Sequence, residues 1–556
     1  MCTELLSVKN LTVSFLKDGL WRPAVQNISF SVNLGETLGI VGESGSGKSV
    51  SCLALLSLLP KEVARIESGV ATLKIQNQVI ELLKSSEASR SLRGSEIGMI
   101  FQEPMTSLNP LFKCGDQLVE VIRRHLNLAR KEAVQLAEEW FQKVELPNPR
   151  RIISAYPHEL SGGQRQRVMI AMAMCCKPKL LIADEPTTAL DVTVQKSVLD
   201  LISRLQKEHN TAVVFISHDL GVVRSIADNV LVMQKGEAKE YDSADKIFKN
   251  PSTAYAKSLI ACKPENTNKK YRLTTVDQVI AGETLTQLRP PTNVNDGQVI
   301  YKVEGLKKYY GKRASLFGGK SEIIKAVNNV SFEIRKGETL GLVGESGCGK
   351  STLSKIITGL LTADSGVLIY NGVDISGYSM RDWRQLRGRI QFIFQDPFSA
   401  LNPKHSVKKV LEEVLVKHQA SLNKQERESL CTKLIIDVGL SVDSLYKYPH
   451  QFSGGQRQRV VIARALAANP EFIIADESVS ALDVSVQAQV LNLLNDLKAE
   501  YNLTFLFISH DLSVVNYMSD RVMVMREGEI VEHGEAEEIY TNPRHPYTQK
   551  LLDSVY

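Results

Sequence analysis

Two glycine-rich segments of the sequence follow the pattern G-x-x-x-x-G-K-[ST]. In such a loop the glycines let backbone N–H groups wrap around phosphate oxygens, and the lysine neutralises the β- and γ-phosphates of a nucleotide. Lys48 and Lys350 are these lysines, and Ser49 and Ser351 are the hydroxyls that would ligate Mg²⁺. One copy could be a chance loop rich in glycine and serine, but two copies at matched positions predict nucleotide binding. The expected phosphate-binding residues are Gly42, Glu43, Ser44, Gly45, Ser46, Gly47, Lys48, Ser49, Gly344, Glu345, Ser346, Gly347, Cys348, Gly349, Lys350, Ser351 and Thr352.

Two pairs of carboxylates each follow a run of hydrophobic residues: Asp184 with Glu185, and Asp476 with Glu477. A strand end beside a phosphate loop is where a carboxylate can hold Mg²⁺, and we assign that role to the two aspartates. The glutamates are then placed to orient or deprotonate the attacking water. A solvated strand end is the plain alternative, and it is a common arrangement when such a pair occurs alone.

A Ser-Gly-Gly-Gln turn that leads into a helical pattern also occurs twice. Such a turn makes a poor core segment, and it predicts free backbone N–H groups at a helix N-terminus, where the helix dipole favours an anion. The residues of the two turns are Ser161, Gly162, Gly163, Gln164, Ser453, Gly454, Gly455 and Gln456.

The motifs repeat at an almost constant offset, which indicates a duplicated domain. Lys350 follows Lys48 by 302 residues, and His510 follows His218 by 292 residues. The offset drifts little, so the two halves share one fold, with a short deletion in the second half.

The elements that must position these motifs are strands alternating with helices. Short hydrophobic runs at residues 37–41, 180–183 and 212–216 each lead directly into a motif, and residues 110–154 have helical spacing. This alternation predicts an α/β fold in each half, with a mostly parallel sheet and a helical insertion.

Between the halves the periodic pattern lapses into a segment rich in proline, asparagine and lysine. We therefore expect a first domain at residues 1–262, a linker at 263–298 and a second domain at 299–556. A linker that behaves as flexible coil would span on the order of 30–35 Å.

Composition limits the class of protein. The chain has 43% hydrophobic and 23% charged residues and a net charge of +5, which is ordinary for a globular protein and too slight to indicate nucleic acid. The sequence has no apolar run long enough for a spanning helix and no signal peptide at its start, so we expect a cytosolic chain. If the chain works at a membrane, other subunits must hold it there. Its eight cysteines include no C-x-x-C pair, which makes a zinc or iron–sulfur site improbable.

Taken together, these motifs resemble the ATP-binding cassette (ABC) family, and the resemblance covers essentially both halves. In that family Ser-Gly-Gly-Gln is the signature loop, which contacts the γ-phosphate of ATP held by the opposite cassette. The resemblance identifies Gln102 and Gln395 as the Q-loop glutamines, which take part in catalysis and also bind Mg²⁺. It identifies His218 and His510 as the histidines that contact the γ-phosphate. A lone histidine after an apolar strand is more often structural, but these two follow identical Phe-Ile-Ser strings. The resemblance also places the D-loops at residues 189–191 and 481–483. It implies two P-loop NTPase domains, each with an antiparallel β subdomain beside its mostly parallel sheet.

Two aromatic residues match the family position that stacks on adenine, Phe15 and Tyr310. As single aromatics near strands they could equally belong to the core. Both sites have a full set of motifs, so the resemblance implies two hydrolytic sites, with ATP and Mg²⁺ as cofactors. Ser478 replaces the proline found at Pro186, and Phe452 replaces Leu160, without removing a phosphate or Mg²⁺ contact.

Shorter motifs are similar to those of the dipeptide, oligopeptide and nickel importer group. They are Ser-Leu-Asn-Pro at residues 107–110, Ala-Leu-Asn-Pro at 400–403 and His-Pro-Tyr-Thr at 545–548. The equivalent tail of the first half has lost its His-Pro, and the cysteine cluster that many members carry is absent from both tails. The fusion of two cassettes resembles the ATPases of microcin C-type peptide importers, and less closely those of glutathione importers.

The resemblance implies a motor whose cassettes pair within one chain at the cytoplasmic face of the inner membrane. Its expected partners are two transmembrane permease subunits and an extracytoplasmic substrate-binding protein, and no nucleic acid. The alternative is a soluble tandem ABC ATPase that acts on ribosomes or DNA. Such proteins usually carry a long charged linker, zinc cysteines or a large coiled-coil insertion, none of which is evident in this sequence. Export is less favoured, because exporters commonly fuse their membrane segments to the cassette.

Overall fold

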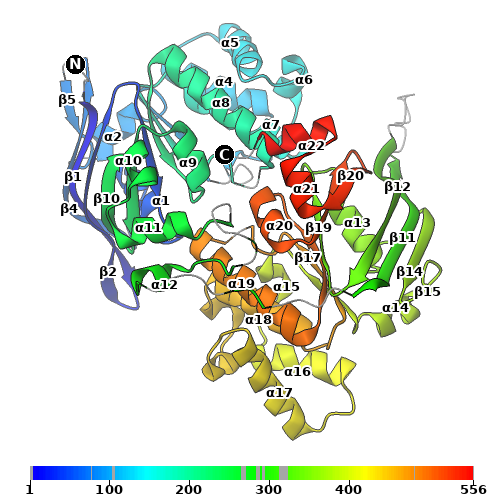
Figure 1. Ribbon diagram of the computed structural model, residues 1–556. Coiled ribbons are helices and arrows are strands. Elements are labelled where there is room, and N and C mark those ends of the chain that lie inside the picture. Colours follow the sequence, from blue (N-terminus) through cyan, green and yellow to red (C-terminus); the bar gives the residue numbers. More distant parts are fainter. Residues whose placement is uncertain are drawn as a thin grey trace. The chain divides into compact units, whose positions relative to one another are not determined.

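The computed structural model divides into two compact units, Met1–Ile260 and Ala261–Val555, and the strands follow the same order in both (Figure 1). The structure describes residues 4–76, 78–84, 86–102, 107–188, 190–264, 269, 271–282, 288–290, 295–311, 323–480 and 482–554. None of the described helices has both the length and the apolar composition of a transmembrane segment.

The core sheet of the first unit carries the strand ends that lead into the motifs. Its strands are β3 (Thr37–Val41), β6 (Ile97–Ile100), β7 (Leu180–Asp184), β8 (Ala212–Ile216), β9 (Asn229–Gln234) and β10 (Glu237–Ser243), in the order β10-β9-β3-β8-β7-β6. All neighbouring pairs are parallel except β9 with β10. Strands β3, β7 and β8 are buried at every residue, which is typical of a parallel sheet covered on both faces.

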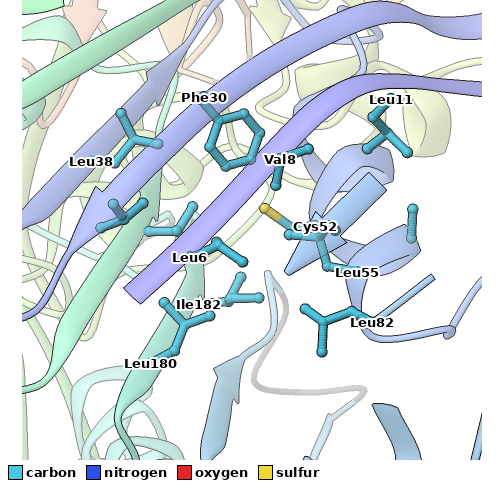
Figure 2. Close-up of a cluster of buried hydrophobic side chains, with 14 of the residues drawn as sticks. Leu6, Val8, Leu11, Phe30, Leu38, Cys52, Leu55, Leu82, Leu180 and Ile182 are labelled. Atoms are coloured by element: carbon cyan, nitrogen blue, oxygen red, sulfur yellow. The ribbon is translucent and has the colours of Figure 1, made fainter. Parts of the chain in front are cut away.

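An antiparallel sheet with the order β2-β1-β4-β5 forms the second layer. It consists of β1 (Glu4–Lys17), β2 (Leu20–Asn33), β4 (Ala64–Ile75) and β5 (Gln78–Glu81). Helix α1 (Lys48–Leu55) is joined to both sheets by one buried cluster, in which its Cys52 and Leu55 meet Val8 of β1 and Ile182 of β7 (Figure 2). The helix that follows the phosphate loop is therefore anchored on both sheets.

Helices account for the rest of the first unit. The expected insertion consists of α4 (Cys114–Leu126), α5 (Arg130–Lys143) and α6 (Pro149–Ser154). Helix α5 buries Ala133, Ala137, Trp140 and Phe141, which lie on one face at helical spacing. The other helices are α2 (Ser86–Leu92), η1 (Pro157–Glu159), α7 (Gly162–Met174), α8 (Val192–His209), α9 (Leu220–Ile226), α10 (Ala244–Lys249) and α11 (Ala254–Ala261).

The second unit repeats this architecture, with sheet orders β12-β11-β14-β15 and β16-β17-β18-β13-β19-β20. The strands are β11 (Asn295–Gly311), β12 (Ile323–Lys336), β13 (Thr339–Val343), β14 (Ser365–Tyr370), β15 (Val373–Asp374), β16 (Ile390–Ile393), β17 (Phe472–Asp476), β18 (Thr504–Ile508), β19 (Arg521–Arg526) and β20 (Glu529–Glu535). The helices are α12 (Val276–Ile280), α13 (Lys350–Ile357), α14 (Met380–Leu386), α15 (Pro397–Ala400), α16 (Val407–His418), α17 (Lys424–Asp437), η3 (Val442–Tyr446), η4 (Pro449–Gln451), α18 (Gly454–Leu466), α19 (Val484–Tyr501), α20 (Leu512–Met518), α21 (Ala536–Thr541) and α22 (Pro546–Leu552). The expected α/β fold, with its antiparallel subdomain and helical insertion, is confirmed.

The segment expected to be a linker is partly folded onto the second unit. The guanidinium of Arg272 donates two hydrogen bonds, of 2.6 and 2.7 Å, to the carboxylate of Asp496 on α19. Leu273 is 1% exposed, and its backbone N–H donates to Oδ1 of Asn492 at 2.9 Å. Residues 276–280 then form α12. The expectation of flexible coil is wrong here, because an apolar side chain and paired polar groups compensate for the entropy lost on ordering.

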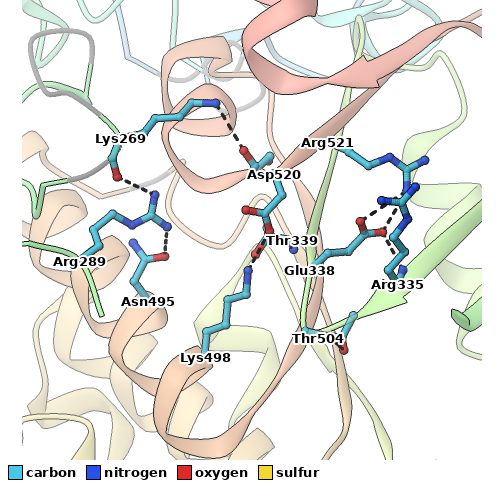
Figure 3. Close-up of polar contacts among 12 residues, drawn as sticks. Lys269, Arg289, Arg335, Glu338, Thr339, Asn495, Lys498, Thr504, Asp520 and Arg521 are labelled. Atoms are coloured by element: carbon cyan, nitrogen blue, oxygen red, sulfur yellow. Dashed lines mark hydrogen bonds and ion pairs between the residues drawn. The ribbon is translucent and has the colours of Figure 1, made fainter. Parts of the chain in front are cut away.

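A second contact holds the described end of the same segment (Figure 3). The guanidinium of Arg289 donates to the carbonyl of Tyr517 at 2.8 Å and to Oδ1 of Asn495 at 2.6 Å. Next to it, the ammonium of Lys498 lies 3.0 Å from Oδ2 of Asp520. Residues 265–268, 270, 283–287 and 291–294 of the expected linker lie outside the described residues. The contacts at Arg272 and Arg289 tie this segment to α19 and to the end of α20.

Candidate active sites

Each phosphate loop joins a buried strand to a helix, β3 to α1 in the first unit and β13 to α13 in the second. Gly42 has a φ of 150° and Gly47 a φ of 98°, values that L side chains rarely adopt. A Cβ atom at Gly42 would lie 2.1 Å from the carbonyl oxygen of Met233, and one at Gly47 would lie 2.7 Å from that of Ala24. The loop thus requires glycine at both positions.

The loop lysines are buried and held by loop carbonyls. Lys48 is 5% exposed, and its ammonium donates to the carbonyls of Gly42 at 2.7 Å and Glu43 at 2.9 Å. Lys350 makes the same two bonds, to Gly344 at 2.6 Å and to the following residue at 2.9 Å. The ammonium is therefore already positioned within the loop where the β- and γ-phosphates are expected.

The two aspartates lie at the ends of β7 and β17, next to hydroxyls of the loop helices. The hydroxyl of Ser49 donates to Oδ1 of Asp184 at 2.9 Å. In the second unit Ser354 donates to Oδ2 of Asp476 at 3.5 Å. Burial raises the pKa of Asp184, and burial followed by the charge of the next glutamate raises the pKa of Asp476 to about 6. A cation placed here would restore the charged form of both carboxylates.

Three side chains converge on the carboxylate of Glu185. Its Oε2 atom accepts hydrogen bonds from Nε2 of Gln102 at 3.1 Å and from the hydroxyl of Thr188 at 2.9 Å, and it lies 3.2 Å from Nδ1 of His218. Burial has the largest effect on this group and raises its pKa. The hydrogen bond and charge of His218, with the Thr188 hydroxyl, outweigh burial and hold the pKa of Glu185 at about 2. The carboxylate is therefore ionised at neutral pH and acts only as an acceptor.

The second unit has the same cluster with one difference. Oε2 of Glu477 accepts from Nε2 of Gln395 at 2.6 Å, and Oε1 lies 3.5 Å from Nδ1 of His510. The hydroxyl of Ser480, at the position of Thr188, donates instead to the backbone carbonyl of Glu477 at 2.9 Å. Sequence reasoning missed both hydroxyls, although a hydroxyl three residues after each glutamate is visible in the repeat. The two neighbouring hydroxyls thus differ in their acceptor, which is the side chain of Glu185 in the first unit and the backbone of Glu477 in the second.

The predicted signature residues form helix starts. Ser161 is the N-cap of α7, where its hydroxyl accepts from the N–H of Gln164 at 3.3 Å, and Ser453 caps α18 in the same way. The sequence predicts free N–H groups for an anion at this helix start, and the cap uses one of them. A Cβ atom at Gly163 would lie 2.6 Å from Cγ1 of Val194, so this glycine allows α7 to approach α8 closely. Within the described residues, no hydrogen bond or ion pair joins either serine to the phosphate-loop cluster of its own unit.

The structure describes only some of the remaining predicted residues. Phe15 is partly buried and packs against the core of the first unit, whereas Tyr310 on β11 is 42% exposed. The D-loop residues Ala189 and Ala481 lie outside the described residues, and so do residues 103–106 of the first Q-loop. Asp191 is described, and its carboxylate caps α8 by accepting from the N–H of Val194 at 2.9 Å.

A sequence profile for the ABC transporter family matches residues 25–188 and 327–480, one copy in each unit. The chain belongs to the ABC transporter family. It is an ABC ATPase with two cassettes, each containing a phosphate loop, an Asp-Glu pair and a histidine beside the glutamate. A second profile, described as the C-terminal region of oligopeptide/dipeptide transporters, matches residues 240–287 and 531–556.

Individual relatives agree with this assignment over nearly the whole ABC chain. The glutathione import ATP-binding protein GsiA of Salmonella paratyphi A is 46% identical over 561 residues, and that of Escherichia coli O6:H1 is 46% identical over 558 residues. Both alignments cover 99% of this chain and 89% of the relative. Among solved structures, cbiO1 from Clostridium perfringens, part of the ABC transporter complex cbiONQ, is 27% identical with a TM-score of 0.39, over 44% of this chain and 92% of that one. The expected family is confirmed, while the nearer likeness to microcin C-type ATPases stays a prediction.

Proposed function

We propose that this ABC ATPase hydrolyses MgATP at two sites and drives the import of peptides or peptide-like compounds through separate membrane subunits. The observation that carries the proposal is the combination of two ATP-site clusters with two oligopeptide-transporter tails in one chain. The name of the GsiA relatives, which refers to glutathione import, supports a small peptide-like substrate.

The oxygen donors of both clusters fit Mg²⁺, which prefers hydroxyl, carboxylate and amide oxygens. The residues that would hold it are Ser49, Gln102 and Asp184 in the first site and Ser351, Gln395 and Asp476 in the second. When bound, Mg²⁺ would supply positive charge that stabilises the negative charge developing on the transferred phosphoryl group. Glu185 and Glu477 would orient or deprotonate the attacking water, and His218 and His510 would contact the γ-phosphate.

The cassettes would pair within the chain, so that each signature serine completes the site of the other cassette. ATP binding would close this pair and hydrolysis would reopen it. The chain would work at the cytoplasmic face of the inner membrane on two permease subunits, supplied by an extracytoplasmic substrate-binding protein. Because the described helices include no transmembrane segment, those subunits would provide its attachment.

Affinity purification of the tagged full chain from detergent-solubilised membranes tests this proposal. We expect integral membrane subunits to copurify, and we expect glutathione or a mixture of dipeptides, added with the binding protein, to stimulate ATP hydrolysis in proteoliposomes. A chain that copurified with ribosomes or DNA and never with integral membrane subunits would support the alternative, a soluble tandem ATPase.

A further inference from the structure

A tyrosine in the C-terminal tail of the second cassette contacts the phosphate loop of the same cassette. Tyr547, in the first turn of α22, is 6% exposed, and its hydroxyl accepts a hydrogen bond of 3.1 Å from the backbone N–H of Glu345. This N–H belongs to the same peptide group as the carbonyl of Gly344. That carbonyl accepts the 2.6 Å hydrogen bond from the ammonium of Lys350. One peptide group is thus held on one side by the tail and on the other by the phosphate-loop lysine.

The tail fixes the tyrosine in place. Nδ1 of His545 caps α22 by accepting from the N–H of Tyr547 at 3.1 Å. The guanidinium carbon of Arg526 on β19 lies 5.1 Å from the centroid of the tyrosine ring. The carboxylate of Glu532 on β20 accepts from the N–H groups of Arg544 at 2.7 Å and His545 at 3.1 Å. The hydroxyl is therefore positioned by the turn that precedes α22 and by the core sheet.

We propose that Tyr547 is a positioning residue for ATP at the second site. Its hydroxyl fixes the orientation of the Gly344–Glu345 peptide, and this peptide fixes Lys350 before the nucleotide arrives. A hydrogen bond at the N–H end of a peptide also strengthens the bond that its carbonyl accepts. A loop that is already ordered loses less entropy when it binds phosphate, so the contact increases affinity for ATP. The proposal rests on the proposed ATP site and gives a role to the tail, which the sequence left without one.

The test uses the full chain with Lys48→Ala, so that only the second site binds nucleotide, and measures the Kd of a fluorescent, non-hydrolysable ATP analogue. Tyr547→Phe retains the ring and removes the hydroxyl. We expect the Kd of the analogue for this variant to be about three- to tenfold higher, which is the effect of losing one hydrogen bond. With the first site intact and ATP as substrate, we expect KM to rise while kcat stays the same.

Tyr370→Phe is the matched control, because Tyr370 is 3% exposed and its hydroxyl donates a 3.0 Å bond to Glu471, away from the loop. An unchanged Kd in Tyr547→Phe, or an equal rise in both variants, would overturn the proposal. Lys350→Ala separates this outcome from a failure of the site itself. If Lys350→Ala does not weaken binding, the ATP site is misplaced; if it does and Tyr547→Phe does not, only the role of the tail is wrong.

Discussion

His510 and Glu477 form a partly buried pair at the edge of the second core sheet, with Nδ1 of the histidine 3.5 Å from Oε1 of the glutamate. Glu477 follows β17 directly and has a φ of 48°, a left-handed conformation that is uncommon for a residue with a side chain. His218 and Glu185 repeat the pair at 3.2 Å, and Glu185 has the same φ of 48°. Strain of this kind persists only where surrounding contacts stabilise it, and it is often found at functional sites.

The His510–Glu477 pair predicts a pH-dependent stability in the absence of nucleotide. Burial, the largest influence on His510, lowers its pKa, but the hydrogen bond and charge of Glu477 outweigh it and raise the pKa above 6.5. The hydrogen bond from His510 is the largest influence on Glu477 and lowers its pKa below 4.5. The histidine contribution is complete below pH 6.5 and is lost as pH rises through the raised pKa, while the glutamate contribution is complete above pH 4.5 and is lost as pH falls through the lowered pKa.

Glu477→Gln should therefore lower Tm more at about pH 5.5 than at about pH 9, because His510 loses its charge as the pH rises through its raised pKa. Differential scanning calorimetry of the nucleotide-free chain measures the difference. Glu304→Gln is the control, because Glu304 pairs with a lysine, Lys302, and not with a histidine, on the exposed face of β11. Equal losses of Tm at the two pH values would contradict the assigned pair.

The two glutamates provide the most direct test of the chemistry. We expect Glu185→Gln with Glu477→Gln to reduce ATP turnover by more than about tenfold while ATP stays bound, because the amide cannot accept a proton from water. Steady-state hydrolysis and retention of radiolabelled ATP after gel filtration measure the two effects. A decrease of less than tenfold would exclude the glutamates as general bases or water-positioning groups.

Substitutions of the two candidate adenine-stacking residues should have different effects on stability, because only Phe15 packs against a buried core. Tyr310→Ala removes a side chain that is 42% exposed, so we expect a rise in the ATP Kd at the second site of about three- to tenfold, with little change in Tm. Phe15→Ala should lower Tm as well, because Phe15 packs against the buried cluster of the first unit. If Tyr310→Ala binds ATP as tightly as the unchanged chain, the aromatic residue is not an adenine contact.

Much of each site could be predicted from the sequence, because its residues follow strands of one parallel sheet. The carboxyl ends of such strands meet at one edge, so motifs that follow different strands come together. This brings Glu185, after β7, to His218, after β8. The contact between Tyr547 and Glu345 could not be predicted, because it joins residues 202 positions apart and depends on where the tail turns.

The linker is a segment whose structure could not be predicted from its composition. Its composition is typical of coil, but composition does not describe the surface on which a segment can dock. Arg272 and Leu273 find a carboxylate and an amide on α19, which are visible only once that helix is folded. Local sequence rules could not have indicated this contact.

This docking predicts protection from protease. Trypsin should cleave after Arg272 slowly in the folded chain, and Asp496→Ala should accelerate that cleavage about three- to tenfold, because it removes a two-bond carboxylate contact. Glu500→Ala, on the same helix but facing Lys433, is the control and should leave the rate unchanged. Cleavage that is equally fast in all three chains would restore the flexible-coil interpretation.

The proposed pairing of the cassettes predicts different effects of one substitution at the two sites. Ser453→Arg places a large cation at the start of α18, where ATP held by the opposite cassette would bring its γ-phosphate. We therefore expect hydrolysis at the site of Lys48 to fall by more than about tenfold, and the site of Lys350 to keep more of its activity. Photolabelling with an azido-ATP, followed by proteolysis between the cassettes, assigns trapped nucleotide to each site.

The matched control for this prediction is Ser379→Arg. Ser379 is also an exposed helix N-cap, and its hydroxyl accepts a bond of 3.4 Å from Asp382, so both variants lose a similar cap worth about 1 kcal/mol. Within the described residues, Ser453 has no hydrogen bond or ion pair to the cluster around Lys350, so the loss of a cap alone gives no reason for one site to fail before the other. Selective loss at the site of Lys350 would mean that each cassette uses its own signature serine, and the two cassettes would then not complete each other's sites.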